Sequence, residues 1–121
     1  MATILVVDDE FDIREIAGRV LQRRGHTVVL CEGAADALAV SAAIDLLLVD
    51  RMLPGMDGLE IAARLRTRRP RLPVVVMSGY PVQPETMPDP PSVFLQKPML
   101  PGVIVTAVNA LLREAASGPA K

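Results

Sequence analysis

The 121-residue chain lacks several features that mark particular classes of protein. Its single cysteine, Cys31, cannot form an intramolecular disulfide, so we expect a reducing compartment and predict a cytoplasmic location. No apolar run approaches the roughly 20 residues that span a bilayer, and no secretory leader pattern opens the chain. The chain also lacks an excess of positive or negative charge, because it has 13 basic and 14 acidic residues. These absences predict a soluble protein that binds neither membranes nor nucleic acid.

The chain does have enough apolar sequence for one compact domain. Half of its residues are hydrophobic, and 121 residues leave no room for a second core of normal size. We expect this domain to occupy residues 1–114. Because Ser117, Gly118 and Pro119 fall in the final stretch, residues 115–121 are predicted to form a C-terminal tail or linker.

Two kinds of hydrophobic pattern alternate along the chain. Short β-branched runs predict buried strands at residues 3–7, 27–31, 44–49, 74–77 and 93–95. Apolar residues at helical spacing predict helices at residues 11–24, 34–43 and 100–114, and a further helix that Asp57 caps and that ends before Pro70. Strands that alternate with helices need right-handed crossovers, so the pattern predicts an α/β fold with a parallel, doubly wound sheet.

One segment interrupts this alternation. Between Ser78 and Val93, where another helix would be expected, the chain contains five prolines. An interior proline costs a helix about 3 kcal/mol. We therefore predict an irregular or 3₁₀ connection there.

Acidic residues follow two of the predicted strands. Asp8 and Asp9 end the first apolar run, and Asp50 ends the run LLLVD. Parallel strands bring such residues together at the carboxyl edge of the sheet, where open α/β sheets bind their ligands. Because clustered like charges are costly unless a cation lies among them, the pattern predicts a cationic partner at this edge.

Four motifs carry a resemblance to a known family. ILVVDDE, LLLVDRMLPGMDGLE, VVVMSGY and FLQKP follow one another in this order, and the stretch from Thr3 to about Arg113 resembles the receiver domain of bacterial two-component response regulators. The resemblance implies a flavodoxin-like five-stranded parallel sheet in the order 2-1-3-4-5, and the five prolines predict that its fourth helix is short or irregular. It also implies a phosphorylation-dependent switch that is not an enzyme, and that catalyses only its own phosphotransfer and slow self-dephosphorylation.

The resemblance assigns a phosphoacceptor and a metal site. Asp50 matches the carboxylate that attacks a phosphohistidine and becomes an acyl phosphate. Asp8 and Asp9 match the acidic pair that holds Mg²⁺, with Asp9 the better candidate for a direct ligand and Asp8 for one acting through water. Asp50 itself and the backbone carbonyl of Met52 would complete the protein ligands.

Three further residues have implied roles. Lys97 matches a lysine that reaches the phosphoryl oxygens, and its peptide bond to Pro98 is expected to be cis. Ser78 matches a hydroxyl that donates to the phosphoryl group. Ser78 and the aromatic residue at the Phe94 position are the implied switch. Phe94 replaces the more common tyrosine and has no hydroxyl to form a hydrogen bond. Only packing would therefore favour an inward or an outward orientation of this side chain.

The implied partners are proteins. A histidine kinase or a histidine phosphotransfer protein would supply the phosphoryl group, the downstream target is unspecified, and the expected state is a monomer or weak homodimer. No DNA-binding output domain is expected. Two interpretations stay open: Met1 favours a complete small regulator, whereas the FLQKP ending also resembles receivers at the ends of hybrid sensor kinases.

Other functions on a similar architecture fit the residues less well. A haloacid-dehalogenase-type hydrolase would need an aspartate where Met52 stands. A flavin-binding module would need a hydroxyl- and glycine-rich loop where DDEFD stands. A degenerate receiver would not be expected to keep its acidic, hydroxyl and lysine residues. Finally, bulky Met52 and Tyr80 near the expected path of a hydrolytic water predict a slowly hydrolysed acyl phosphate.

Overall fold

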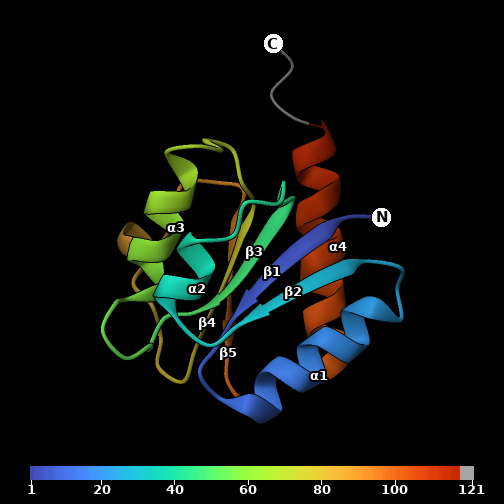
Figure 1. The fold of residues 1–121 in the computed structure, drawn as a ribbon, viewed down its shortest axis with the longest axis horizontal. Coiled ribbons are helices and arrows are strands. Elements are labelled where there is room, and N and C mark those ends of the chain that lie inside the picture. The colour runs from blue at the N-terminus through green and yellow to red at the C-terminus, as the bar shows by residue number, and fades with distance from the viewer. Residues whose placement is uncertain (118–121) are drawn as a thin grey trace.

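The fold is a parallel β-sheet with helices on both faces, seen in a computed structural model that describes residues 1–117 (Figure 1). The strands are β1 (Thr3–Val7), β2 (Thr27–Cys31), β3 (Leu46–Asp50), β4 (Val74–Ser78) and β5 (Ser92–Gln96). All neighbouring strands are parallel, in the order β2-β1-β3-β4-β5. The predicted flavodoxin-like order 2-1-3-4-5 is confirmed.

The register of the sheet brings the ends of the strands to a common edge. Val7 of β1 is level with Val49 of β3, and Asp50 is level with Met77 of β4. The residues that follow β1 and β3 therefore emerge side by side, as expected for the carboxyl ends of adjacent parallel strands. This edge is where the predicted site residues gather.

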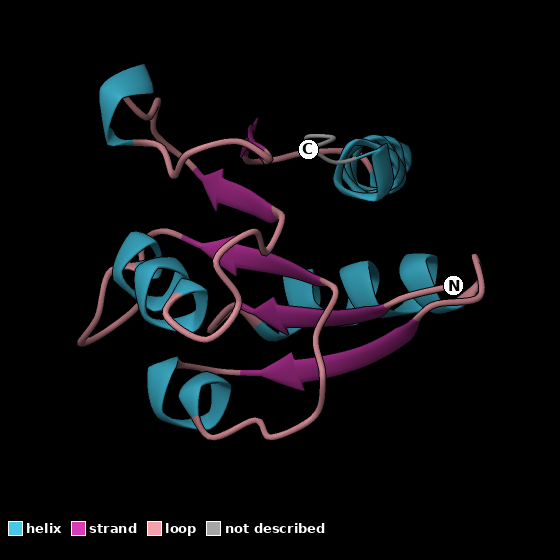
Figure 2. Ribbon diagram, turned by 90° about the horizontal axis from the view of Figure 1, so that it is seen from above, coloured by secondary structure: helices cyan, strands magenta, loops and turns pink. Residues whose placement is uncertain are grey.

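Helices cover the two faces in pairs. α2 (Ala34–Leu38) and α3 (Gly58–Arg66) lie on one face of the sheet, and α1 (Phe11–Gln22) and α4 (Pro101–Ser117) lie on the other (Figure 2). Leu47 and Val49 of β3 join the hydrophobic cluster that includes α3, whereas Leu46 and Leu48 join the cluster that includes α1 and α4. Because both faces are covered, the central strands β3 and β4 are buried throughout, which explains their continuous apolar sequences.

Several predicted boundaries were wrong. The helix predicted at residues 34–43 ends at Leu38, because only Ala37 of this short helix is buried and such small-residue helices gain little from packing. The first helix ends at Gln22 instead of residue 24, and the third strand spans 46–50 instead of 44–49. The fourth strand extends one residue further than predicted and the fifth extends one residue at each end.

The C-terminal helix is longer than predicted. α4 continues to Ser117, so residues 115–117, which the sequence assigned to the tail, are helical. The remaining residues of the predicted tail, 118–121, lie outside the described residues. The division into a domain at 1–114 and a linker at 115–121 stays a prediction. Within residues 1–117, no helix is both long enough and apolar enough to cross a membrane.

The proline-rich connection forms almost no regular structure. Between β4 and β5 the chain makes a single 3₁₀ turn, η1 (Pro84–Thr86), which confirms the predicted loss of a helix. Arg66 at the end of α3 donates to Leu72 O at 2.8 Å and to Pro91 O at 3.2 Å, and so holds the starts of β4 and β5 together. The Lys97–Pro98 peptide bond is cis, as the resemblance implied.

Candidate functional site

The three predicted aspartates come together at the carboxyl edge of the sheet. One carboxylate oxygen from each of Asp8, Asp9 and Asp50 lies within 4.8 Å of the others. Asp8 and Asp50 are buried, whereas Asp9 is exposed. The cluster thus has a buried floor of two carboxylates and a third carboxylate open to solvent.

Asp8 is held in place by hydrogen bonds to its side chain, its backbone N–H and its carbonyl oxygen. Its Oδ1 accepts the backbone N–H of Glu10 at 2.8 Å, and its own N–H donates to Cys31 O at 3.1 Å. Arg14 of α1 donates from Nη1 to Asp8 O at 2.7 Å and is almost fully buried. The sequence analysis missed Arg14, although a charged residue on the inward side of α1, one position after Ile13, was a usable signal.

Asp50 is fixed by the loop that follows it. Its Oδ1 accepts the backbone N–H of Met52 at 3.0 Å. Asp57 caps α3 as predicted, because its Oδ1 accepts the N–H of Leu59 at 2.9 Å. The next residue, Gly58, lies so close to the strand end that an added Cβ would be 2.2 Å from Asp50 O. Gly58, which the sequence analysis also missed, is therefore required for the loop to pass Asp50.

Lys97 supplies a cation to this acidic cluster. Its Nζ lies 2.9 Å from Asp8 Oδ2, 3.1 Å from Asp50 Oδ2 and 2.8 Å from Glu10 Oε1. Only 13% of the Lys97 side chain is exposed. Burial alone lowers the pKa of Lys97, but its close contacts with the three carboxylates outweigh burial and raise that pKa above its ordinary value. Lys97 is therefore a permanent positive charge at neutral pH.

Asp8 experiences opposing influences. Burial raises the pKa of its carboxyl, while the N–H of Glu10 and the ammonium of Lys97 act to lower it and the charge of Asp50 raises it further. The net result is a raised pKa. Asp8 Oδ2 contacts Lys97 as an ion pair, and no donor within residues 1–117 makes an aligned hydrogen bond to this buried oxygen. An oxygen of this kind, next to two other carboxylates, is suited to a divalent cation.

The donor set fits a hard cation. All three side chains offer carboxylate oxygens, which Mg²⁺ prefers, and the exposed position of Asp9 leaves room for the waters that Mg²⁺ usually keeps. A groove of about 520 Å³ opens beside Asp9 and is lined by the loop at residues 51–57. The cluster therefore has both the ligands for an ion and open space beside it.

The predicted switch residues lie on the two neighbouring strands. Ser78, at the end of β4, is buried, and its Oγ accepts the N–H of Tyr80 at 3.1 Å. Its carbonyl accepts the N–H of Lys97 at 2.8 Å, which ties the end of β4 to the lysine. Phe94, in the middle of β5, is partly buried against the cluster that includes α3. It is level with Val76, so it lies deeper in the sheet than Ser78.

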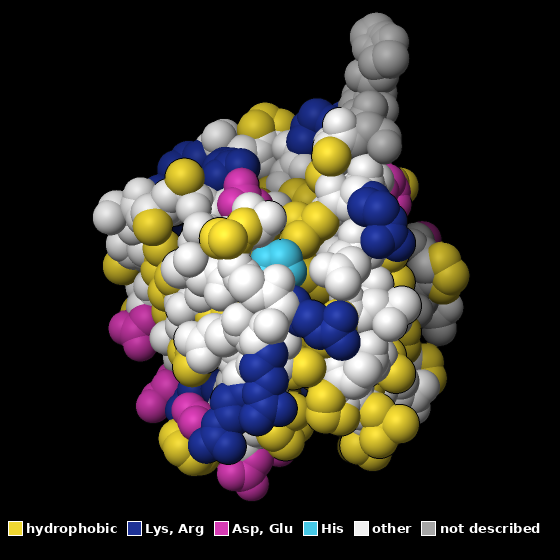
Figure 3. Space-filling view, turned by 90° about the vertical axis from the view of Figure 1, so that its right-hand side faces the viewer, with side chains coloured by type: hydrophobic (Ala, Val, Ile, Leu, Met, Phe, Trp, Pro, Cys, Tyr) yellow, Lys and Arg dark blue, Asp and Glu magenta, His cyan; other side chains and the backbone are white. Residues whose placement is uncertain are grey.

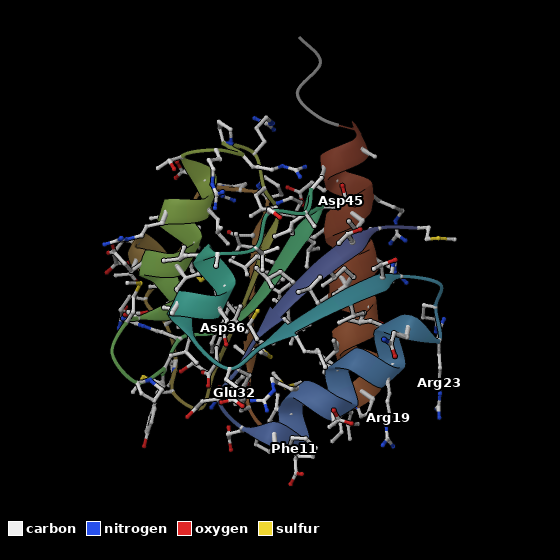
Figure 4. All side chains as sticks on the ribbon, viewed as in Figure 1. Phe11, Arg19, Arg23, Glu32, Asp36 and Asp45 are labelled. Carbon is white, nitrogen blue, oxygen red and sulfur yellow. The ribbon has the colours of Figure 1, made fainter. Side chains whose placement is uncertain are left out.

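Further acidic residues follow β2 at the same edge. Glu32 and Asp36 lie near the end of β2 and the start of α2, on the side where β1 leads toward Phe11, whereas Asp45 lies at the opposite end of the sheet (Figure 4). Glu32 pairs with Arg14 at 3.7 Å. The carboxyl edge is thus acidic beyond the three central aspartates.

Comparisons with known proteins agree with this geometry. The model of the response regulator receiver domain matches residues 4–109. The transcriptional regulatory protein ResD of Bacillus subtilis is 32% identical over 117 residues, which cover 93% of this chain and 48% of ResD. The structure of a response regulator receiver protein from Sinorhizobium medicae is 31% identical, with a TM-score of 0.84 and coverage of 93% and 94% of the two chains.

A third relative bears on the acidic cluster. The structure of response regulator protein TrrA from Thermotoga maritima, in complex with Mg²⁺-BeF, is 28% identical, has a TM-score of 0.79, and matches over 92% of this chain and 99% of that one. The chain spans less than half the length of the curated relatives it matches. Because the family match runs from β1 into α4, through all five strands, the chain belongs to the response regulator receiver domain family.

Proposed function

We propose that Asp50 of this receiver domain accepts a phosphoryl group from a phosphohistidine, with Mg²⁺, and that the modification changes protein contacts. Receiver domains in general are phosphoacceptor switches that bind Mg²⁺ at an acidic pocket. One observation in this chain carries the proposal: Lys97 Nζ lies 3.1 Å from Asp50 Oδ2, beside a cluster of three carboxylates. Nucleophile, cation and metal-ligating oxygens are thus within reach of one phosphoryl group.

The proposed transfer is a single displacement at phosphorus. A carboxylate oxygen of Asp50 forms the new P–O bond, the P–N bond to the histidine breaks, and the leaving imidazole nitrogen takes up a proton. Asp9 directly, Asp8 through water, Asp50 and the Met52 carbonyl would hold Mg²⁺. The metal ion, when bound, neutralises part of the charge that gathers on the transferring group.

Two residues of the chain act on the phosphoryl oxygens. Lys97 is charged and needs only a small movement from Asp50 Oδ2 to a phosphoryl oxygen on the same carboxylate. The Ser78 hydroxyl accepts from Tyr80 and keeps its own proton free to donate. Both groups gain new acceptor oxygens only when the phosphoryl group arrives, which couples them to phosphorylation.

The proposed switch follows from the added charge. A phosphoryl group brings roughly −1.5 to −2 charges to one point. Shifting a two-state equilibrium from 1:99 to 99:1 needs about 5.5 kcal/mol, which several charge-assisted hydrogen bonds in a shielded site would supply. Ser78 would move toward the phosphoryl group and Phe94 would repack behind it. Since η1 replaces the usual fourth helix, we expect the altered surface to centre on β5 and α4.

A histidine kinase or a histidine phosphotransfer protein is the proposed donor. Large exposed hydrophobic side chains follow four of the five strands at the acidic edge: Phe11, Met52, Tyr80 and Leu100. Such an apolar rim around a charged centre fits a protein partner that presents a phosphohistidine. The side of the molecule shown in Figure 3 mixes hydrophobic side chains with both basic and acidic ones. We propose a cytoplasmic monomer or weak homodimer that contacts no nucleic acid.

Intact-mass measurement tests the proposed phosphoacceptor. The protein is incubated with Mg²⁺ and a small acyl-phosphate donor. Wild type is expected to gain one phosphoryl group and Asp50→Asn none. Asp9→Ala is expected to stay folded but to lose metal-dependent labelling. Labelling of Asp50→Asn to the wild-type extent, or no labelling of wild type, would contradict the proposal.

We also propose that the acyl phosphate is long-lived. Met52 and Tyr80 are exposed beside the site, and neither side chain is a base that would activate a water near Asp50. Decay of the phosphorylated protein, followed by intact mass after removal of the donor, is expected to take minutes or longer. Complete loss within seconds would contradict this part of the proposal.

A further inference from the structure

Glu10 holds an unusual position between helix and site. It is the N-cap residue of α1, yet its side chain makes no capping hydrogen bond. Its carboxylate instead reaches a residue 87 positions away in sequence, and Oε1 accepts a hydrogen bond from Lys97 Nζ at 2.8 Å. An N-cap side chain normally contributes by accepting an N–H of the first turn. The Glu10 side chain therefore contacts Lys97 instead of capping α1.

The three partners of Lys97 are not equivalent. Asp8 and Asp50 belong to the cluster of oxygens suited to a divalent cation, whereas Glu10 does not. The Asp8 and Asp50 side chains are buried, but 60% of the Glu10 side chain is exposed. An ammonium has three N–H donors, and here three carboxylates lie within 3.1 Å of it. Two of these contacts compete with a metal ion and the third does not.

We infer that Glu10 is a positioning residue that retains Lys97 at the rim of the site when a divalent cation enters the carboxylate cluster. This inference rests on the proposed function. An ammonium and a divalent cation repel each other, and both are attracted to the carboxylates of Asp8 and Asp50. Entry of the cation weakens the hold of these two oxygens on Lys97. Glu10 then becomes its main partner, so Lys97 stays next to Asp50, where a phosphoryl group would arrive.

The inference predicts how each of three substitutions changes the affinity for Mg²⁺. Lys97→Met removes the competing ammonium, so Mg²⁺ should bind more tightly. Glu10→Gln removes the alternative partner of Lys97, so displacing Lys97 becomes harder and Mg²⁺ should bind more weakly, by roughly three- to fivefold for an exposed ion pair. In the Lys97→Met background, Glu10→Gln should have almost no effect, because no ammonium remains to be held.

A simpler role for Glu10 gives a different pattern. If its negative charge only attracts cations through solvent, Glu10→Gln weakens Mg²⁺ binding equally with and without Lys97. Asp12, an acidic residue in the first turn of α1, is the matched control for this effect. Glu10→Asp is a second discriminator, since it keeps the charge but shortens the side chain that reaches Lys97.

The test is a Mg²⁺ titration of the full chain by calorimetry, without phosphoryl donor. The variants are Glu10→Gln, Glu10→Asp, Lys97→Met, the Glu10→Gln/Lys97→Met double variant and Asp12→Asn. We expect both Glu10 variants to weaken binding, Asp12→Asn to leave it nearly unchanged, and the Glu10→Gln effect to disappear in the double variant. An equal loss in both Lys97 backgrounds, tighter binding by Glu10→Gln, or a loss in Asp12→Asn as large as in Glu10→Gln would overturn the inference.

This outcome is separable from that of the proposed function. Mg²⁺ binding needs no phosphoryl transfer, so the titration gives its answer whether or not Asp50 is labelled. Wild type that takes up a phosphoryl group but shows no coupling between Glu10 and Lys97 would contradict the role of Glu10 alone. Wild type that takes up none would contradict the proposed function, whatever the coupling.

Discussion

The two ends of the sheet hold charged residues in opposite ways. At the carboxyl end, Asp8 and Asp50 are buried and Lys97 lies within 3.1 Å of both. At the amino end, exposed arginines of the α3–β4 connection line a groove of about 910 Å³, and Arg69 approaches Asp45 only to 3.9 Å. Solvent and salt screen the charges at the amino end, whereas burial makes those at the carboxyl end interact strongly. The buried charges at the carboxyl end therefore determine local structure, whereas an exposed pair such as Arg69 and Asp45 contributes little.

The largest expected effect comes from the close approach of Gly58 to Asp50. In Gly58→Ala the new methyl group would lie 2.2 Å from Asp50 O, a backbone atom that cannot move without distorting β3. We expect the free energy of unfolding to fall by about 3 kcal/mol, the upper part of the range for overpacking. The proposed phosphorylation of Asp50 should slow as well, because the loop at residues 51–57 must shift. Urea unfolding and intact mass measure the two effects.

Gly102→Ala is the matched control. Gly102 lies in the first turn of α4, and no atom of residues 1–117 beyond its neighbours in the helix lies within 4 Å of a Cβ added there. Alanine should stabilise this helix by roughly 0.5–1 kcal/mol, because glycine loses more conformational freedom on folding. If both substitutions cost the same, the proximity of Gly58 to Asp50 would not be the cause of the loss.

The sequence predicted which strands end at the carboxyl edge, but not the contacts between the residues there. Five β-branched runs predicted the strands, and the prolines after Ser78 predicted the missing helix, because both are local effects of residue type. The strand order and the roles of Asp8, Asp50 and Lys97 came from the resemblance. The need for Gly58 could not be predicted, because it depends on the distance between a loop and a strand end that only the folded chain defines.

A buried and an exposed arginine sharpen the comparison of the two ends. Arg14→Met removes the 2.7 Å hydrogen bond to Asp8 O and leaves that buried carbonyl without this donor, which should cost about 2 kcal/mol. Arg69→Met removes only an exposed pair at 3.9 Å and should cost less than about 0.5 kcal/mol. Chemical denaturation of both variants at the same salt concentration measures the difference. Equal costs would mean that burial does not distinguish the two ends.

Glu10 shows where sequence analysis stops, whereas Arg14 shows a signal that the sequence contained but that gave no partner. Both belong to a stretch that predicts an ordinary amphipathic helix start, and a charged residue there normally faces solvent. Arg14 instead donates a hydrogen bond to Asp8 O, just after β1. Glu10 accepts a hydrogen bond from Lys97, which lies 87 residues further along the chain. Contacts across 87 residues depend on the packing of β1 against its neighbours, which no local pattern records.

The smallest expected effect concerns the charge of Asp8. In the unfolded chain its carboxyl titrates near the ordinary pKa of 3.8, and burial raises this pKa in the folded chain. The folded protein therefore binds more protons between these two values, so stability from this group falls as the pH rises through that window. Asp8→Asn removes the titration. The stability of Asp8→Asn relative to wild type should thus increase from about pH 3 to about pH 7, measured by urea unfolding in chelated buffer. A relative stability that decreases instead would mean that the ion pair with Lys97 outweighs burial, and that charge is held favourably at the carboxyl end even without metal.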